Sequence, residues 1–480
     1  MWRRSEYSKD LKLSCRRACA ASIVVAVAYI SAVGIASPQR TSDRRPPPMR
    51  QGFQHRLVLP NGMIVLLYPI AGADRVAMET FYKVGFLNEP KGVPQAAHLL
   101  EHMVCYAATA SYKAHQSFEL LQRKGMANAE TLPAFTHFDF DIPSNDLELA
   151  IQIESERLSS LAVVPDTVRE ESPRCNIEAE NVEKIPQAGM VKFAFCAFNQ
   201  SWAHGMSEVR IRRVLGAPYL PMLESMRAQF YRPENMIVTI VGGFKPDEAV
   251  KLIHKHLASI NGRRGMPSHP INWPGVKKDA TVRWDSKVRA VCVAFPPPST
   301  SRDRLILSLW GDIVNMRLST DMNLRASSEC VFVSNHLWNV GTIPFFLYAT
   351  AKPGVSTAQL RKLMLDRAIQ AATGKPTEFE VIQIGLLAQQ IGREPDSDWK
   401  AIKQQAEAQA KQYGTDILMA PRMQLMQSAL NLGFRELFMG ADPSRSVRDA
   451  RSVKQSDLNR KIRQYLDPSK RIVTVLEPMK

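Results

Sequence analysis

The first half of the chain alternates between strand-like and helix-like hydrophobic patterns. Two apolar runs in His55–Pro69 flank Pro60-Asn61-Gly62, and this arrangement predicts a β-hairpin. Arg75–Phe86 predicts another strand, and Gly125–Pro143 predicts two more. Apolar residues recur at helical spacing in three other segments: Pro94–Cys105, Ser117–Lys124 and Asn145–Leu161. This half therefore mixes β-strands with amphipathic helices.

The rest of the chain repeats this mixture. A Glu-rich helix is predicted around Asn176–Lys184, and Tyr231–Ile260 predicts a strand, a turn and a helix. Thr281–Phe295 predicts one strand, and long helical segments follow it. At the end of each half, PENMIVTIV (Pro233–Val241) resembles PSKRIVTVL (Pro468–Leu476). We therefore predict an α+β fold with two similar domains, each a mostly antiparallel sheet covered by helices.

Composition sets the expected domain boundaries. Basic residues, the apolar run Ala18–Ala36 and small residues before Ser37 are typical of a secretory signal, which we predict over residues 1–36. The other boundaries follow from Pro-rich and polar stretches. We expect a Pro/Arg-rich linker at 37–52, a first domain at 53–260, a second linker at 261–280 and a second domain at 281–480.

The N-terminal segment predicts a periplasmic or secreted protein. An uncleaved anchor that leaves the protein facing the periplasm is the alternative, because the apolar run is nearly long enough to span a bilayer. A mitochondrial presequence is less favoured, because the run is continuously apolar. Contact with a membrane is expected only if this segment is not removed.

The chain is basic, with a formal net charge of +16. Such a surface can attract acidic polymers or anionic membranes. No run of aromatic residues interleaved with basic ones accompanies the charge, and the sequence has no nucleic-acid-binding motif. We therefore expect a basic soluble protein without a nucleic-acid partner. Of the seven cysteines, the five outside the predicted signal are odd in number and widely scattered, which is not the pattern of a disulfide framework, although one bridge could form in an oxidising compartment.

One turn of the predicted helix at 94–105 carries His98, Glu101 and His102, an H-x-x-E-H pattern. Residues four apart share a helix face, so both imidazoles can reach one zinc ion, and Glu101 can act as a general base on its water. The alternative is a chance pattern on a partly buried helix. The motif supplies only two ligands, and catalytic zinc needs a third protein ligand. We expect Cys105 to be a small core residue, since a fourth protein ligand would close the site.

This motif resembles that of the pitrilysin and insulinase family of zinc metallopeptidases, in its short two-domain form. Four stretches resemble the family's landmarks in order and spacing: LPNGMIV (Leu59–Val65), VGFLNEPKGVPQAAHLLEHM (Val84–Met103), GMANAETLPAFTHF (Gly125–Phe138) and YRPENMIVTIVGGF (Tyr231–Phe244). The resemblance covers residues 55–260 and is only general over 281–480. It implies a zinc-bearing peptidase domain at 53–260 and a second domain without zinc at 281–480.

The resemblance also implies one zinc ion per chain, with three ligands: His98, His102 and Glu178. It implies Glu101 as the catalytic base, and Glu171, seven residues before Glu178, as a residue that orients a ligand. Glu180 is the rival for the third ligand. Pro173 departs from the family's pattern, because a Pro is expected to start or kink the helix between Glu171 and Glu178.

In the family, a strand that carries Asn-Ala pairs with the substrate backbone, and Asn128 and Ala129 occupy that place here. The alternative is an ordinary edge strand. Family members complete the site with a substrate-holding Arg and, seven residues later, a Tyr. Here Phe332 follows Arg325 at that spacing, and Phe lacks the hydroxyl donor. The resemblance thus implies a homo- or heterodimer with a second pitrilysin-like subunit. Either a separate partner supplies Arg and Tyr, or a catalytic homodimer tolerates Phe332.

We therefore expect a zinc-dependent endopeptidase that cleaves peptides or small unfolded polypeptides, with this chain as the zinc-bearing subunit of a two-subunit assembly. Two alternatives stay open. One is a non-catalytic structural or binding subunit of a pitrilysin-like complex. The other is a basic periplasmic binding module whose zinc site is structural.

Overall fold

The computed structural model describes the following residues: 55–89, 93, 95–132, 134–183, 208–209, 219–262, 278–284, 288–333, 344–383, 398–414, 416, 419–439 and 452–478. The predicted signal (1–36) and the predicted linker at 37–52 lie outside these residues. Within the described ranges, no helix is both long enough and apolar enough to cross a bilayer.

The first sheet contains the strands predicted from the first half of the chain. Its order is β1-β2-β7-β3-β5-β4, and only β2 and β7 pair in parallel. The strands are β1 (His55–Val58), β2 (Ile64–Pro69), β3 (Arg75–Tyr82), β4 (Ala127–Thr131), β5 (Thr136–Pro143) and β7 (Met236–Gly242). The predicted hairpin is confirmed as β1 and β2, which pair antiparallel across the Pro-Asn-Gly turn.

The second sheet has the order β10-β11-β9-β12-β8-β6. Its strands are β6 (Glu208–Val209), β8 (Lys278–Trp284), β9 (Ala290–Phe295), β10 (Ser328–Val333), β11 (Phe345–Ala351) and β12 (Ile472–Pro478). When β2, β7, β3, β5 and β4 are matched to β8, β12, β9, β11 and β10, every pairing has the same direction in both sheets. The internal sequence echo falls on the matched strands β7 and β12, so the prediction of two similar α+β domains is confirmed.

One strand prediction is wrong. Thr281–Phe295 was expected to form a single strand, whereas it contributes to β8 and β9, which lie on opposite sides of β12. The segment holds two apolar runs separated by the polar Asp285, Ser286 and Lys287. Because β12 comes from the end of the chain, this pairing is not visible in the local pattern of the segment.

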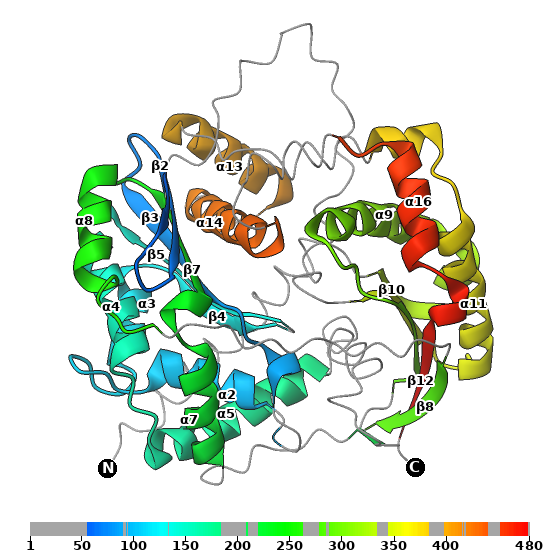
Figure 1. Ribbon diagram of the computed structural model, residues 1–480, viewed down its shortest axis with the longest axis horizontal. Coiled ribbons are helices and arrows are strands. Elements are labelled where there is room, and N and C mark those ends of the chain that lie inside the picture. The colour runs from blue at the N-terminus through cyan, green and yellow to red at the C-terminus, as the bar shows by residue number, and fades with distance from the viewer. Residues whose placement is uncertain are drawn as a thin grey trace, which may run out of the picture.

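Helices cover the outer face of each sheet (Figure 1). On the first sheet they are α2 (Ala96–Tyr106), α3 (Gln116–Lys124), α4 (Leu147–Ser159), α7 (Leu220–Phe230) and α8 (Pro246–His256), with α5 (Pro165–Glu183) packed on α2. On the second sheet they are α9 (Ser301–Thr320), α11 (Thr357–Thr373) and α16 (Gln455–Tyr465), and the short α10 (Met322–Ser327) precedes β10.

The inner faces of the two sheets share one apolar core with α13 (Trp399–Tyr413) and α14 (Ala420–Met439), which lie between the sheets in Figure 1. Phe434 of α14 packs on Phe81 of β3, with ring centroids 5.7 Å apart. Thus α14, from the second half of the chain, packs on the first sheet, while β6, from the first half, joins the second. The division of the chain into 53–260 and 281–480 stays a prediction.

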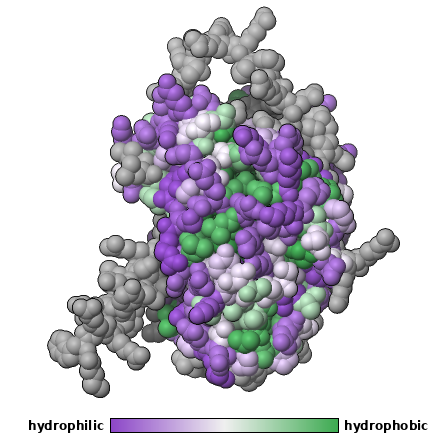
Figure 2. Space-filling model, turned by 90° about the vertical axis from the view of Figure 1, so that its left-hand side faces the viewer, coloured by the Kyte–Doolittle hydropathy of each residue, from purple (hydrophilic) through white to green (hydrophobic). Residues whose placement is uncertain are grey.

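The side of the molecule that carries α8 and α4 is mostly hydrophilic, with small separate apolar patches (Figure 2). The α8 helix contributes to this hydrophilic surface, because it buries the apolar Ala249 and Ile253 and leaves its polar residues towards solvent. Its first turn is acidic and its last turn basic, an arrangement that complements the helix dipole. This side therefore presents the polar faces of amphipathic helices to solvent.

Candidate metal centre

The N-terminus of α2 is fixed by a buried carboxylate. Both oxygens of Glu89 accept backbone N–H bonds, from Gln95 at 3.0 Å and from Ala97 at 3.1 Å. Gln95 has a φ of 63°, in the left-handed region that non-glycine residues rarely adopt. Glu89 satisfies two backbone donors that the helix leaves open and places a negative charge at the positive end of its dipole. The helix that carries the H-x-x-E-H motif is thereby held at its start.

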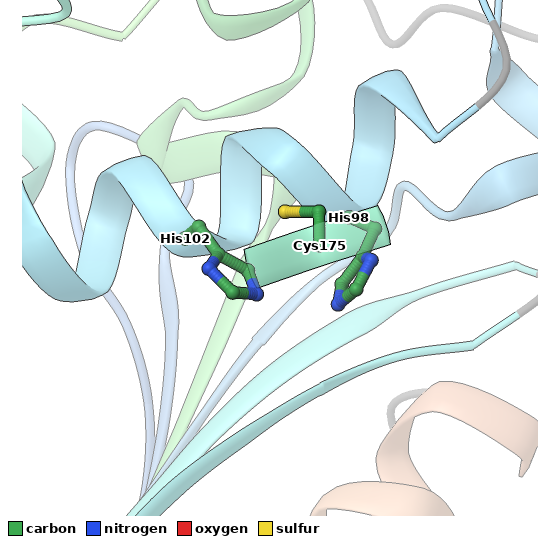
Figure 3. Close-up of side chains that lie close together, drawn as sticks. All are labelled: His98, His102 and Cys175. Atoms are coloured by element: carbon green, nitrogen blue, oxygen red, sulfur yellow. The ribbon is translucent and has the colours of Figure 1, made fainter. Parts of the chain in front are cut away.

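Three donor atoms converge between α2 and α5. Oε2 of Glu178 lies 3.4 Å from Nε2 of His98 and 3.3 Å from Nε2 of His102. Figure 3 shows the two imidazoles projecting from α2 to the same side, with Cys175 of α5 beside them. Ligand atoms at the corners of a tetrahedron around zinc, with bonds of about 2.1 Å, lie about 3.4 Å apart. The two distances from Glu178 to the imidazole nitrogens fit ligands of one zinc ion.

Each histidine is hydrogen-bonded at Nδ1, which leaves Nε2 for a metal. Nδ1 of His102 donates to Oε2 of Glu171 at 2.9 Å, and Nδ1 of His98 lies 3.4 Å from Oε1 of Gln95. A metal-binding histidine commonly donates its second ring N–H to a carboxylate or carbonyl in this way, which fixes the ring's tautomer and orientation. Glu171 and Gln95 therefore orient the two imidazoles.

The α5 helix begins earlier than predicted. A helix around Asn176–Lys184 was expected, with Pro173 starting or kinking it, but the helix runs from Pro165 to Glu183 with Pro173 inside it. The prediction that Pro173 starts the helix is therefore wrong. Because the helix is continuous, Glu171 and Glu178 lie on one face of α5, and Glu171 is completely buried. Its second oxygen accepts a bond of 2.5 Å from Arg174.

The sequence interpretation did not single out Cys175 as a site residue. One donor atom each of His98, His102 and Cys175 lie within 4.8 Å of one another, and Cys175 is fully buried. Cys175 comes four residues after Glu171 and three before Glu178, which is the spacing of one helix face. The helix predicted around Asn176–Lys184 does not include Cys175. The spacing of Cys175 from Glu171 and Glu178 would have indicated a site residue if the helix had been predicted to start earlier.

Glu101 lies beside this centre and is buried. Its Oε2 accepts a hydrogen bond of 2.6 Å from the hydroxyl of Thr131, on the edge strand β4. Burial raises the pKa of Glu101 above its usual range, although His98, His102 and the Thr131 hydroxyl oppose the shift. A carboxylate with a raised pKa is better matched to proton transfer near neutral pH.

The ion-pair contacts shift the pKa of two other groups of the centre. Burial disfavours the charged form of Glu178, but the hydrogen bonds from His102 and His98 outweigh burial and hold its pKa well below the usual range. Burial also lowers the pKa of His102, yet Cys175, Glu171 and Glu178 together raise it well above the usual value. Carboxylates therefore surround the two imidazole rings, and their negative charge would favour binding of a metal cation.

The remaining predicted residues lie in different surroundings. Asn128 and Ala129 are half-buried on β4, at the end of the strand order of the first sheet. Glu180 is exposed on α5, away from the three converging donors, and Cys105 lies in the apolar core as expected. In the described part of the chain, no hydrogen bond or ion pair joins the exposed side chain of Arg325 on α10 to the centre. Phe332 is buried on β10 against Phe346.

Sequence comparison assigns the chain to a peptidase family. A family model described as insulinase (peptidase family M16) matches residues 65–199, and one described as peptidase M16 inactive domain matches residues 221–384. The chain is 26% identical over 213 residues to the zinc protease PqqE of Helicobacter pylori, a match that covers 42% of this chain and 46% of the relative. The matches span about half the length, or less, of the curated relatives.

Solved structures of proteases share the fold. A protease from Helicobacter pylori superposes with a TM-score of 0.64 at 18% identity, covering 88% of this chain and 99% of that chain. The periplasmic protease PqqL from Escherichia coli gives a TM-score of 0.54 at 15% identity, covering 89% of this chain and 48% of that chain. These identities show the fold alone. The family models and the zinc proteases among the curated relatives define a peptidase-type protein. The chain belongs to the insulinase-type peptidase family M16.

Proposed function

We propose that this chain is a zinc-dependent endopeptidase. The observation that carries the proposal is that Oε2 of Glu178 lies within 3.4 Å of Nε2 of both His98 and His102, with the buried carboxylate of Glu101 on the same helix as the two histidines. These three ligands would hold one zinc ion per chain and leave a position for water. The curated relatives named zinc proteases support the same assignment.

Each residue around the zinc ligands has a separate role in the proposed reaction. Zinc, when bound, lowers the pKa of its water towards about 7 and polarises the scissile carbonyl. Glu101 accepts the proton of the attacking water and later gives it to the leaving amine. Thr131 holds the Glu101 carboxylate by its hydroxyl, and Glu171 holds His102. Glu171 is thus a positioning residue.

The edge strand β4 supports a peptide as substrate. Its one pairing within the described sheet is with β5, so its other edge has backbone groups that an extended peptide can pair with. Ala129 and Thr131 share one face of β4, and Thr131 contacts Glu101. A peptide added beside Asn128 and Ala129 would therefore run next to the catalytic carboxylate. We propose peptides or small unfolded polypeptides as the substrate class.

A second subunit would complete the site. The exposed Arg325 and the buried Phe332 do not form a substrate-facing Arg–aromatic pair within the described residues. The Escherichia coli protease chain is about twice as long as the part that this chain matches, which is consistent with two such units working together. We therefore propose a heterodimer in which a separate pitrilysin-like partner supplies Arg and Tyr, with a homodimer that tolerates Phe332 as the alternative. From the N-terminal pattern of this chain and the periplasmic location of the Escherichia coli protease, we propose that the assembly is periplasmic.

Cleavage of a quenched peptide library by the purified chain, with and without a candidate partner subunit, tests this proposal. We expect zinc-dependent cleavage only when the partner is present. Full activity of the single chain would contradict the two-subunit part of the proposal. Zinc binding without cleavage under either condition would favour the non-catalytic alternative, in which the chain is a structural or binding subunit.

A further inference from the structure

A second group of metal-ligating side chains lies on the opposite face of the first sheet from the zinc centre. Side chains along β4 point alternately to the two faces of the sheet. Thr131 therefore lies on the face of Glu101 and α2, and Asn128 and Glu130 lie on the face of α14. On that side, strand pairing aligns Glu130 with His137 and aligns Asp139 with both Asn128 and Glu79. Three neighbouring strands therefore bring carboxylates around one imidazole.

The contacts within this cluster are close. Nδ1 of His137 lies 3.2 Å from Oε2 of Glu79 and 3.9 Å from Oδ1 of Asp139. Nε2 of the same ring lies 3.5 Å from Oε2 of Glu130. One donor atom each of Glu79, His137 and Asp139 lie within 4.8 Å of one another. Around one ion with bonds of about 2.1 Å, donors lie about 3 to 4.2 Å apart, so only small side-chain movements would close the cluster around a cation.

The cluster is buried, and one of its oxygens has no hydrogen-bond partner. The relative exposure is 2% for Glu79, 5% for His137 and 8% for Asp139. Oδ1 of Asp139 is buried and accepts no hydrogen bond. A buried carboxylate oxygen without a donor is costly. This oxygen of Asp139 therefore indicates that a cation binds beside it.

The charges around the cluster do not balance. Among the described residues, no Lys or Arg forms an ion pair with Glu79, Asp139 or Glu130, and their common partner is one imidazole. Asp141, two residues further along the same face of β5, is instead held by the guanidinium groups of Arg75 and Arg422. With the imidazole neutral, as it must be to bind a metal, the three carboxylates carry a net charge of −3, and one divalent cation would reduce it to −1.

We propose that Glu79, His137 and Asp139 form a second metal site that binds a divalent transition-metal ion, with Glu130 as a further ligand at the solvent side. Carboxylate oxygens suit Mn²⁺, Ca²⁺ and Mg²⁺, whereas imidazole suits transition metals, so this mixed set favours a transition-metal ion such as Mn²⁺ over Ca²⁺ or Mg²⁺. Glu130 is the most exposed member, with 33% of its side chain accessible, and it offers the ion an entry at the β4 edge. A bound ion would tie β3, β5 and β4 together.

The protonation of the cluster is consistent with this assignment. Burial, reinforced by Asp139, raises the pKa of Glu79 to about 8. Burial likewise raises the pKa of Asp139 to about 6. In the absence of a cation, protons take up part of the excess negative charge. A metal ion would displace them, as is usual where ligands must be deprotonated.

Binding of Mn²⁺ to the full chain, preloaded with one equivalent of zinc per chain and freed of excess zinc, tests the site by electron paramagnetic resonance of the free ion. We expect one Mn²⁺ per chain in the wild type, with zinc retained, and at least about tenfold weaker binding in Glu79→Gln and in Asp139→Asn. Glu148→Gln, an exposed carboxylate on α4, is the matched control and should bind Mn²⁺ as the wild type does. Thermal unfolding without Mn²⁺ verifies that each variant is folded.

Two outcomes would overturn the proposal. One is a wild-type chain that binds no Mn²⁺ while zinc is retained, which would make the cluster a proton-sharing buried network. The other is loss of Mn²⁺ binding in His98→Ala, which would place the ion in the zinc centre instead. Retention of Mn²⁺ binding in His98→Ala, together with its loss in Glu79→Gln, is the result that we expect.

Discussion

Nδ1 of His102 lies 2.9 Å from Oε2 of Glu171, and this carboxylate is completely buried. The contact joins α2 to α5 and leaves Nε2 of His102 directed at Glu178. One helix thus provides the imidazole, and the other provides both the carboxylate that orients it and the carboxylate that completes the donor set. The continuity of α5 through Pro173 makes this arrangement possible.

Replacing Glu171 with Gln should weaken zinc binding. The amide keeps the size of the side chain but removes the charge that strengthens the hydrogen bond to His102, and the loss of such a partner typically costs about 10- to 100-fold in metal affinity. Competition with a chromogenic chelator measures the zinc dissociation constant. Glu180→Gln, exposed on the same helix, should leave it unchanged. Equal affinities for wild type and Glu171→Gln would refute a positioning role.

Replacing Thr131 with Val should shift the pH profile of peptide cleavage. The Thr131 hydroxyl lowers the pKa of Glu101, which burial otherwise raises. Loss of the hydroxyl should raise this pKa further, and a general base works only when deprotonated. The acidic limb of kcat/KM should therefore move to higher pH. Thr80→Val, which removes a buried hydroxyl without a hydrogen-bond partner, should leave the limb in place. A Thr131→Val profile that matches the wild type would contradict the assignment of Glu101.

Replacing Arg422 with Met should destabilise the packing of α14 on the first sheet. Arg422 donates to both oxygens of Asp141, at 2.8 and 2.9 Å, and Asp141 has no exposed side chain. We expect the free energy of unfolding at pH 7 to fall by about 1–3 kcal/mol, because a buried carboxylate loses a partner. Denaturant unfolding measures the change. Arg361→Met, whose ion pair with Asp279 is largely exposed, should cost about 1 kcal/mol or less.

The cost of Arg422→Met should depend on pH. The guanidinium groups hold the pKa of Asp141 below its usual value, although burial opposes them. A group whose folded pKa is depressed contributes stability above its unfolded pKa, about 3.9, and loses it as pH falls through the folded pKa. The gap between variant and wild type should therefore shrink below about pH 4. A gap that stays constant across this window would argue against Asp141 as the cause.

Replacing Gly433 with Ala should also lower stability, although Ala is the better helix former by about 1 kcal/mol. A methyl group at this position would overlap the ring of Phe81 on β3. The ring is fully buried, so we expect a net loss of about 1–3 kcal/mol in the free energy of unfolding. Met423→Ala, exposed on the same helix, should change stability by about 0.5 kcal/mol or less. A stabilised Gly433→Ala protein would show that α14 is not packed as described.

The sequence was sufficient where local pattern decides the structure. The hairpin formed by β1 and β2 follows from a turn signal between two apolar runs, and His98 and His102 follow from spacing on one helix. Glu178 came from a longer spacing supplied by the family resemblance. These features depend on residues close in sequence or on a known pattern, so they do not require the tertiary structure.

The sequence was insufficient where distant segments meet. The separation of β8 from β9 depends on β12, and the burial of Phe81 depends on α14, more than 300 residues later. The cluster around His137 exists only in the register that aligns Glu79 with Asp139. Cys175 was missed because the start of α5 was predicted too late. In each case the missing information was a pairing or a boundary, and not a residue type.

The central claim is that His98, His102 and Glu178 hold a catalytic zinc ion for which Glu101 is the base. Bound zinc per chain and peptide cleavage, measured together with the partner subunit present, test it most directly in wild type, Glu178→Ala, Glu180→Ala and Glu101→Gln. We predict loss of zinc in Glu178→Ala but not in Glu180→Ala. Glu101→Gln should keep its zinc and lose about 10²- to 10⁴-fold in rate. Cleavage that survives Glu101→Gln, or a wild-type chain that binds no zinc, would contradict the claim.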